Sequence, residues 1–142
     1  MKITLKNNEL APAINFLEGM TLKANKDSRH RTKLVKRIRE AFKELSDEEK
    51  SLMEKFSLLD ENGQLKDGDD QDAKDVAGFN KEQTILMEEE VVIEGGMYAR
   101  NFDEIPRILD DYDGMLSGKD AEVYDRLLDE FEKRILSNQC PY

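Results

Sequence analysis

The chain has 142 residues, of which 38% are apolar and 38% are charged, and its net charge is −10 at pH 7. This length suffices for one domain with its own core but not for two, so we expect residues 1–142 to form a single domain. No apolar run approaches the roughly 20 residues that a membrane-spanning helix needs, and the N-terminus lacks the apolar stretch of a signal peptide. We therefore expect a cytoplasmic protein that does not associate with a membrane.

Cysteine and histidine are too scarce for a zinc site or an internal disulfide. Cys140 is the single cysteine and His30 the single histidine. A structural zinc ion needs several such ligands, and a disulfide needs a second cysteine. The sequence therefore predicts no Cys/His zinc centre and is consistent with a reducing compartment.

Charge is unevenly distributed along the sequence. Residues 1–44 carry eleven Lys or Arg against five Asp or Glu, whereas residues 45–142 carry eleven against twenty-seven. The overall acidity disfavours direct binding to nucleic acid or anionic lipid, because like charges repel. A local basic surface can still act over a Debye length of about 8 Å at physiological salt.

The first predicted elements are a short strand and a short helix. Residues 2–6 alternate polar and apolar side chains, which predicts a strand. Asn8 can cap a following helix in which Pro12 falls in the first turn and Gly19 marks the end. The apolar face of this helix would carry Leu10, Ile14 and Leu17.

The clearest helical pattern runs from about residue 28 to residue 45. Its apolar stripe consists of Leu34, Val35, Ile38, Ala41, Phe42 and Leu45. Basic side chains gather away from this stripe, and we call them the basic face: Arg29, Lys33, Lys36, Arg37, Arg39 and Lys43. The basic face is the candidate partner-binding surface. The basic face can bind the protein's own carboxylates, a second copy of the chain, a partner protein or nucleic acid. Alternatively, it is a solvated surface without a partner.

The sequence next predicts a break, a second helix and an acidic loop. Ser46 and Glu49 form a capping-box pattern, so a new helix is expected to begin there. Its inward side chains would be Leu52, Met53, Phe56 and Leu59. Residues 60–75 combine turn residues with many aspartates, which predicts a solvated, mobile loop.

The second half of the chain is predicted to contain a short sheet segment and two helices. Asn80 or Gln83 can cap a segment that leads into a strand at residues 91–94, after which Gly95 and Gly96 would turn the chain and residues 97–99 would return antiparallel. One helix would start at Asn101 or Asp103, with Pro106 near its first turn. The last helix would start at residues 117–120, and one of its faces would carry Tyr124, Leu127, Leu128, Phe131 and Ile135. We expect a predominantly α-helical α+β fold of four or five helices, with a small β-sheet formed by residues 2–6 and 91–99.

Acidic clusters are candidates for an acid/base or metal-binding site, but the abundance of acidic residues weakens each candidate. Thirty-two acidic residues in 142 produce such clusters by chance. A calcium loop beginning at Asp60 would place Leu65 where glycine is required and Gln71 where a bidentate glutamate is required. His30 lies among cations and is expected to be an ordinary surface residue, and Gly95–Gly96 lacks the spacing of a phosphate-binding loop. We predict no catalytic, metal-binding or cofactor-binding residues and no enzymatic activity.

Two segments carry a resemblance to a known family. Residues 1–10, MKITLKNNEL, precede the basic helix, and residues 116–125 read LSGKDAEVYD. Together they resemble a family of small uncharacterised proteins encoded by phages and prophages of Gram-positive bacteria. The resemblance implies an intracellular phage product and supplies no active-site residues.

These observations lead to three expectations for function. The first is a non-enzymatic protein-interaction protein, an assembly or structural accessory factor of a phage, which would bind a phage structural protein or associate with itself and could be part of the virion. The second is a phage-encoded inhibitor of a host defence or nucleic-acid enzyme, similar in kind to anti-CRISPR proteins, in which the acidic surface of residues 45–142 mimics nucleic acid. The third, a small hydrolase that uses scattered carboxylates, is disfavoured.

Overall fold

The computed structural model describes residues 2–23, 25–95 and 102–139, with the side chains of residues 135–139 left out. The described residues form five α-helices, one 3-10 turn and a two-stranded sheet, which confirms the predominantly helical α+β fold. In chain order the elements are β1 (Lys2–Lys6), α1 (Asn7–Gly19), α2 (Asn25–Lys55), η1 (Gly68–Asp70), α3 (Ala73–Glu88), β2 (Glu90–Glu94), α4 (Ile105–Asp110) and α5 (Lys119–Gln139). None of these helices is long and apolar enough to cross a membrane.

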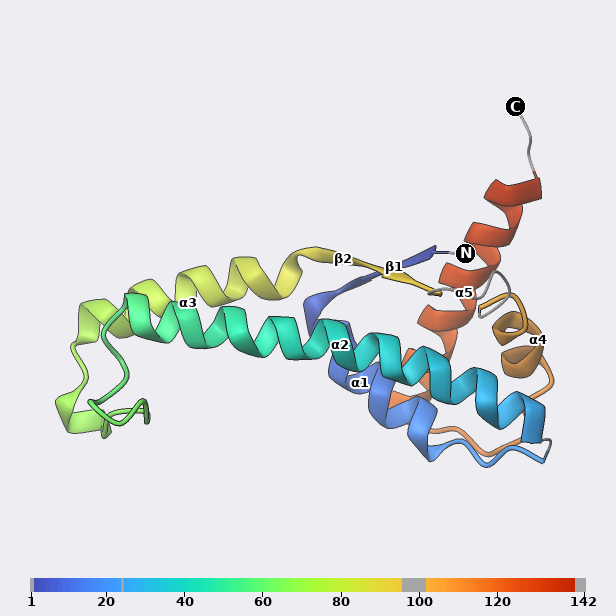
Figure 1. Cartoon of the computed structure of the whole chain (residues 1–142), viewed down its shortest axis with the longest axis horizontal. Coiled ribbons are helices and arrows are strands. Elements are labelled where there is room, and N and C mark those ends of the chain that lie inside the picture. The colour runs from blue at the N-terminus through green and yellow to red at the C-terminus, as the bar shows by residue number, and fades with distance from the viewer. Residues whose placement is uncertain (1, 24, 96–101, 140–142) are drawn as a thin grey trace.

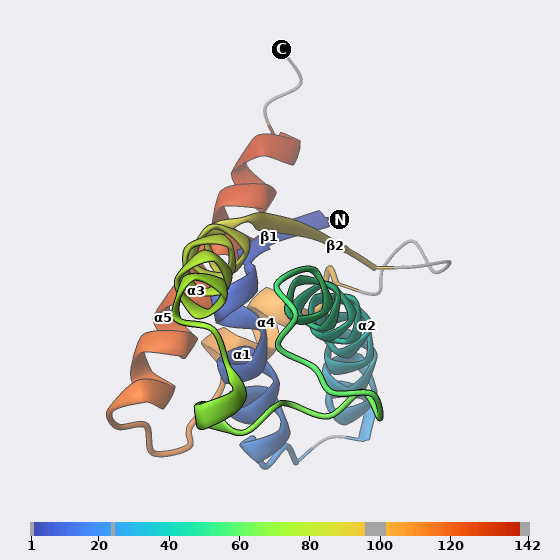
Figure 2. The ribbon, with the colours of Figure 1, turned by 90° about the vertical axis from the view of Figure 1, so that its left-hand side faces the viewer.

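The molecule is elongated, with two unlike ends (Figure 1). At one end, β1, β2, α1, α4, α5 and the first part of α2 gather around a common core, and we call this the core end. The rest of α2, the loop after it and α3 extend away as a helical hairpin (Figure 1). We call this hairpin, residues 44–89, the arm. Figure 2 shows the molecule from the side of the arm, with α2 and α3 lying next to each other.

The two predicted strands pair with each other. β1 runs antiparallel to β2, with Ile3 opposite Ile93 and Thr4 opposite Val92. Ile3, Leu5 and Ile93 are buried on the inner face of the sheet, as the alternating sequence of a half-covered strand requires. The prediction of strands at residues 2–6 and 91–94 is confirmed, whereas the return strand predicted at residues 97–99 lies outside the described residues.

The core lies beneath this sheet and draws on every element of the core end. Phe102 and Phe131 meet edge to face, with ring centroids 6.2 Å apart, and Phe16 meets Tyr124 in the same way at 6.1 Å. The largest side chains with less than 2% exposure are Ile3, Leu5, Leu10, Leu17, Leu34, Ile38, Phe102, Ile105, Leu109, Leu127 and Phe131. The predicted inward residues of α1, and those of α5 with described side chains, contribute to this core or pack against it.

Helix α1 begins earlier than the sequence predicted. Lys6 occupies the N-cap position, and the Glu9 carboxylate accepts the Lys6 N–H at 2.8 Å, so the prediction of Asn8 as the cap is wrong. Pro12 consequently lies in the second turn and removes the helical hydrogen bond to the Asn8 carbonyl. The helix ends at Gly19, as predicted.

Helix α2 is continuous through the predicted break at Ser46. Leu45 and Leu52 continue the apolar stripe of the first part in phase, so the pattern after Ser46 belongs to the same helix. The backbone N–H groups of residues inside a helix already have partners four residues back, and a capping residue has nothing to satisfy there. Phe42, which the sequence assigned to the stripe, is 39% exposed.

The loop at the tip of the arm is ordered by hydrogen bonds of its own. α2 ends in a Schellman motif, in which Ser57 adopts a left-handed φ of 56° and the Leu58 N–H donates to the Met53 carbonyl at 2.9 Å. Asp60 then accepts the N–H groups of Asn62 and Gln64 at 2.8 and 2.9 Å. The loop ends at Asp72, which caps α3 by accepting the Lys74 N–H at 2.7 Å.

Two boundary predictions in this region are therefore wrong. The predicted loop at 60–75 stops at Asp72, because the Asp72 cap starts α3 at Ala73. Asn80 and Gln83 cap nothing, since both lie inside α3. Further along, α4 includes Pro106 in its first turn, as expected.

Candidate functional site

The structure distributes the predicted basic face over two sides of α2. Lys36, Arg39 and Lys43 line a shallow hollow of about 530 Å³ beside the end of α1. Arg37 lies on another side of the helix and forms an ion pair with Glu40 at 3.2 Å. Arg39 pairs with Glu18, so at least two of the six cations have intramolecular partners. The remaining two members are the exposed Arg29 and the half-buried Lys33, and all six remain candidate residues for a partner.

A groove with acidic walls runs along the side of α2 on which Arg37 lies. Two adjoining hollows of about 410 and 200 Å³ share Ala41, Glu44 and Val91. The first lies between α2 and the end of α3, and the second lies between α2 and β2. We call the two together the acidic groove. Its glutamates are Glu40, Glu44, Glu48, Glu82, Glu89, Glu90 and Glu94.

Few cations offset these glutamates. Arg37 is the only Lys or Arg among the lining residues, and it pairs with Glu40. At one end of the groove Glu94 pairs with Lys2 at 3.5 Å. Within the described part of the chain, Glu44, Glu48, Glu82 and Glu89 have no ion pair. Because like charges in one concave surface reinforce each other's potential, the groove attracts cationic groups.

The groove also exposes apolar side chains. Ile85 is 51% exposed and Val92 is 55% exposed, and both belong to the lining. Leu45, Leu52 and Leu86 complete its apolar floor. An exposed apolar strip rimmed by charge is typical of a protein-binding surface, because burying the strip stabilises a complex while the charges select and orient the partner.

Sequence reasoning missed this groove, because its walls come from three elements that are far apart in the chain. On α2, Glu44 and Glu48 are four residues apart and lie on one helix face, while Glu82 of α3 and Glu89 at its C-cap are seven apart. The spacing of these glutamates is the signal in the sequence that could have indicated the groove. Which faces meet, however, depends on how α3 returns along α2.

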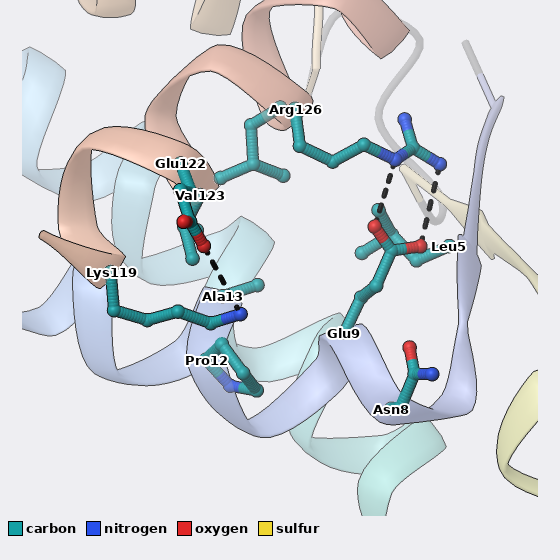
Figure 3. A pocket seen from close by; sticks show the side chains of 10 residues that line it. Leu5, Asn8, Glu9, Pro12, Ala13, Lys119, Glu122, Val123 and Arg126 are labelled. Atoms are coloured by element: carbon teal, nitrogen blue, oxygen red, sulfur yellow. Dashed lines mark hydrogen bonds and ion pairs between the residues drawn. The ribbon is translucent and has the colours of Figure 1, made fainter.

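A separate hollow, of about 470 Å³, lies between β1, α1 and α5 (Figure 3). Arg126 reaches across it to the Glu9 carboxylate, with a nitrogen–oxygen distance of 2.8 Å. At its other end Lys119 pairs with Glu122 at 3.6 Å. Each cation that lines this hollow therefore has a carboxylate partner, and the hollow is close to electroneutral.

Behind this hollow, three side chains of α5 bind the outer edge of β1. Glu130, 4% exposed, accepts the Thr4 N–H at 2.9 Å, and Arg126 donates to the Thr4 carbonyl at 3.0 Å. Arg134 donates to the Thr4 hydroxyl at 2.8 Å and to Glu130 at 3.0 Å. Burial alone raises the pKa of Glu130, but the hydrogen bonds from Thr4, Arg134 and Arg126 outweigh burial and hold the pKa below its ordinary value. These contacts fix α5 to the sheet.

The remaining predicted features carry no chemistry in this arrangement. His30 is half-buried, and its Nδ1 atom is buried with no hydrogen-bond partner in the described part of the chain, so its description as an ordinary surface residue is wrong. Among the residues that the structure covers, no group of three or more His, Cys, Asp or Glu side chains is placed to hold a metal ion.

Comparison with known proteins places the chain in a family. No curated protein and no solved structure matches it. A family model described as a protein of unknown function, DUF1617, matches residues 1–137, which is nearly the whole chain. The chain belongs to this DUF1617 family of proteins of unknown function.

Proposed function

We propose that this protein is a non-enzymatic interaction protein whose acidic groove binds a basic segment of a partner protein. One observation carries the proposal: glutamates from α2, α3 and β2 line one concave surface around the exposed side chains of Ile85 and Val92. Apolar contact in the centre supplies binding free energy, and surrounding charge speeds association and fixes orientation.

The position of the groove supports this role. It lies at the base of the arm, between α2, the end of α3 and β2, and the arm, residues 44–89, carries fifteen Asp or Glu against five Lys or Arg, whereas the rest of the chain carries seventeen of each. The whole net charge of −10 is therefore on the projecting hairpin (Figure 1). The negative charge of the arm adds to the potential of the groove at its base and attracts a basic partner.

The biological setting within this proposal is that of a phage accessory or assembly factor. It is supported by the resemblance of residues 1–10 and 116–125 to small proteins of phages and prophages of Gram-positive bacteria. The partner is then a basic segment of a phage structural protein.

A matched pair of charge variants tests the proposal. The groove variant replaces Glu44, Glu48, Glu82 and Glu89 with Gln, and the tip variant replaces Glu61, Asp67, Asp69 and Asp70 with Gln or Asn, so both lose the same net charge. Proteins captured from phage-infected and uninfected Gram-positive lysates are quantified by mass spectrometry with nuclease present. We expect wild type and the tip variant to retain the same basic partner and the groove variant to lose it by at least tenfold. Equal capture by all three proteins contradicts the proposal.

A second candidate function rests on the charge of the arm as a whole. An elongated hairpin with a net charge of −10 has the sign and shape to occupy a basic nucleic-acid channel, as an inhibitor that mimics nucleic acid would. In that case the tip and groove variants weaken binding to a similar extent, and added DNA or RNA displaces the captured enzyme. Retention of the partner in excess nucleic acid rules out mimicry.

A further inference from the structure

Strand β2 has one edge that the sheet does not use. Thr4 of β1 donates its N–H to Glu130 and accepts at its carbonyl from Arg126, so both of its backbone groups point away from β2. In an antiparallel ladder such a residue faces its partner in a non-hydrogen-bonded pair. Val92, the partner of Thr4, therefore directs its N–H and carbonyl away from β1, and the same alternation applies to Glu90 and Glu94.

The two outer edges of the small sheet differ in their hydrogen-bond partners. At the outer edge of β1, the side chains of Glu130 and Arg126 bond the Thr4 backbone as a neighbouring strand would, and Arg134 donates to the Thr4 hydroxyl. At the outer edge of β2, no described residue bonds the backbone of Val92, and its side chain is 55% exposed. An open edge is a template for pairing with another chain.

The acidic groove continues along this open edge. The hollow of about 200 Å³ is lined by residues 91–94 of β2 on one side and by Arg37, Glu40, Ala41 and Glu44 of α2 on the other. A strand added to β2 would direct alternate side chains toward this α2 wall. The remaining side chains would lie on the outer face beside Glu90, Val92 and Glu94, which are all exposed.

The strand that already pairs with β2 indicates which sequence suits it. On the outer face, Lys2, Thr4 and Lys6 of β1 lie opposite Glu94, Val92 and Glu90. Lys2 forms an ion pair with Glu94, and Thr4 is a β-branched neighbour of Val92. No described residue covers the same row of side chains from the other edge of β2, so a strand added there would be complementary with a basic residue, a β-branched residue and a second basic residue at alternate positions.

We propose that β2 accepts a third strand from a partner protein, through an extended segment in which Lys or Arg flank a β-branched residue at every second position. This inference rests on the proposed function, because it states how the acidic groove holds its partner. Backbone hydrogen bonds to Glu90, Val92 and Glu94 supply affinity, and the glutamates on both walls select basic side chains.

The direct test uses a fluorescent peptide that repeats residues 1–8 of this chain, MKITLKNN, as a model for the basic segment. Replacing Val92 with Pro removes the outward N–H without removing a bond to β1, whereas Val92→Thr keeps the N–H and is the matched control. Fluorescence anisotropy should show binding that weakens at least tenfold in Val92→Pro and by less than threefold in Val92→Thr. Slowed hydrogen exchange at the Val92 amide on peptide binding is the expected structural signature.

A peptide series guards against a folding defect in the proline variant. N-methylation of the peptide at Thr4, on the edge that would pair, should weaken binding at least tenfold, whereas methylation at the adjacent residue should not. If the strand pairs in the other orientation, the effects of the two methylations are exchanged. Equal binding of all methylated peptides overturns strand addition. If the natural partner depends on the groove glutamates but is indifferent to Val92→Pro, strand addition is wrong and the proposed function stands. If the partner is indifferent to both changes, both are wrong.

Discussion

The core end and the arm of this molecule are stabilised in different ways. The core end contains all eleven of the largest fully buried side chains, and the sequence outside the arm has equal numbers of acidic and basic residues. In the arm only Leu45, Leu58 and Phe79 are buried, and acidic residues outnumber basic ones by ten. Apolar burial is therefore concentrated at the core end. The acidic surface, whose like charges repel one another, lies on the arm, where this repulsion costs least stability.

Polar contacts between distant parts of the sequence follow the same division. They join β1 to α5, α1 to α2 and α2 to α4, all within the core end. The arm is bonded to the core end at its base, where Glu88 accepts from Lys6 at 2.9 Å and from Asn8 at 3.2 Å. Toward its tip the arm depends on local contacts, such as the Phe56 ring packed so closely on Gly78 that a Cβ there would lie 2.5 Å from it. We therefore expect the tip to open locally more often than the core end.

Truncating one phenylalanine at each end is the strongest test of this comparison. Phe131→Ala should cost about 3–5 kcal/mol of unfolding free energy, because the side chain is fully buried against Phe102. Phe79→Ala should cost about 2–3 kcal/mol, because the side chain is 8% exposed and the arm can relax. Urea denaturation measures both, and hydrogen exchange should accelerate throughout the chain for Phe131→Ala but mainly in residues 44–89 for Phe79→Ala. Global acceleration by Phe79→Ala contradicts the distinction.

The next largest effect is expected at the buried carboxylate of the core end. Glu130→Gln removes the charge that Arg126 and Arg134 share and should cost about 2 kcal/mol at neutral pH. Asp129→Asn, at an exposed neighbouring position of α5, is the control and should change the free energy of unfolding very little. Thermal denaturation at pH 7 measures both variants, and equal stability of Glu130→Gln and wild type contradicts the assigned role.

The pH dependence of this contribution has a defined sign. The pKa of Glu130 in the folded protein is lowered from 4.5, so the unfolded chain binds its proton more readily than the folded chain does. The stability from Glu130 is fully present above about pH 4.5 and is lost as the pH falls through the lower, folded-state value. The difference in unfolding free energy between wild type and Glu130→Gln should therefore shrink below pH 4.5, and a difference that is independent of pH contradicts this assignment.

A smaller effect is expected where α2 binds the end of α1. Arg31 donates to the Met20 carbonyl at 2.6 Å and to the Leu17 carbonyl at 3.0 Å, and Leu17 also accepts the Met20 N–H, so Arg31 binds the backbone at the end of α1. Arg31→Ala should cost about 1–2 kcal/mol. Arg29→Ala, at an exposed position of the same helix, is the matched control and should be near neutral. Similar destabilisation by both variants would show that the charge of the helix, and not these bonds, matters.

The smallest predicted change stabilises the arm. Ser57 has a left-handed φ of 56°, a conformation that glycine adopts without steric cost. Ser57→Gly should therefore raise the stability of the arm by about 0.5–1 kcal/mol. Ser51→Gly, inside α2, is the control of opposite sign and should lower it by about 0.5 kcal/mol. Hydrogen exchange in residues 44–89 measures both, and destabilisation by Ser57→Gly contradicts the argument.

Local sequence patterns predicted the elements whose signals repeat over several residues. The alternation of residues 2–6, the apolar run of residues 91–94 and the helical stripe from Tyr124 to Phe131 all appear in the structure as predicted. Single-residue signals were less reliable. Ser46 has the pattern of a helix start but lies inside α2, since a cap has no effect where neighbouring turns already satisfy the backbone.

By itself, therefore, the sequence determined the helical α+β class, both strands, the position of the last helix and the excess of acidic residues. Periodicity and composition are properties of consecutive residues and need no knowledge of what lies across the core. Tertiary structure alone decided that α2 continues into the arm, that α3 returns beside it and that glutamates from three elements share a groove with Ile85 and Val92. It also decided that α5 covers the edge of β1 while no described residue covers that of β2, because side-chain bonds to an edge depend on which helix packs there.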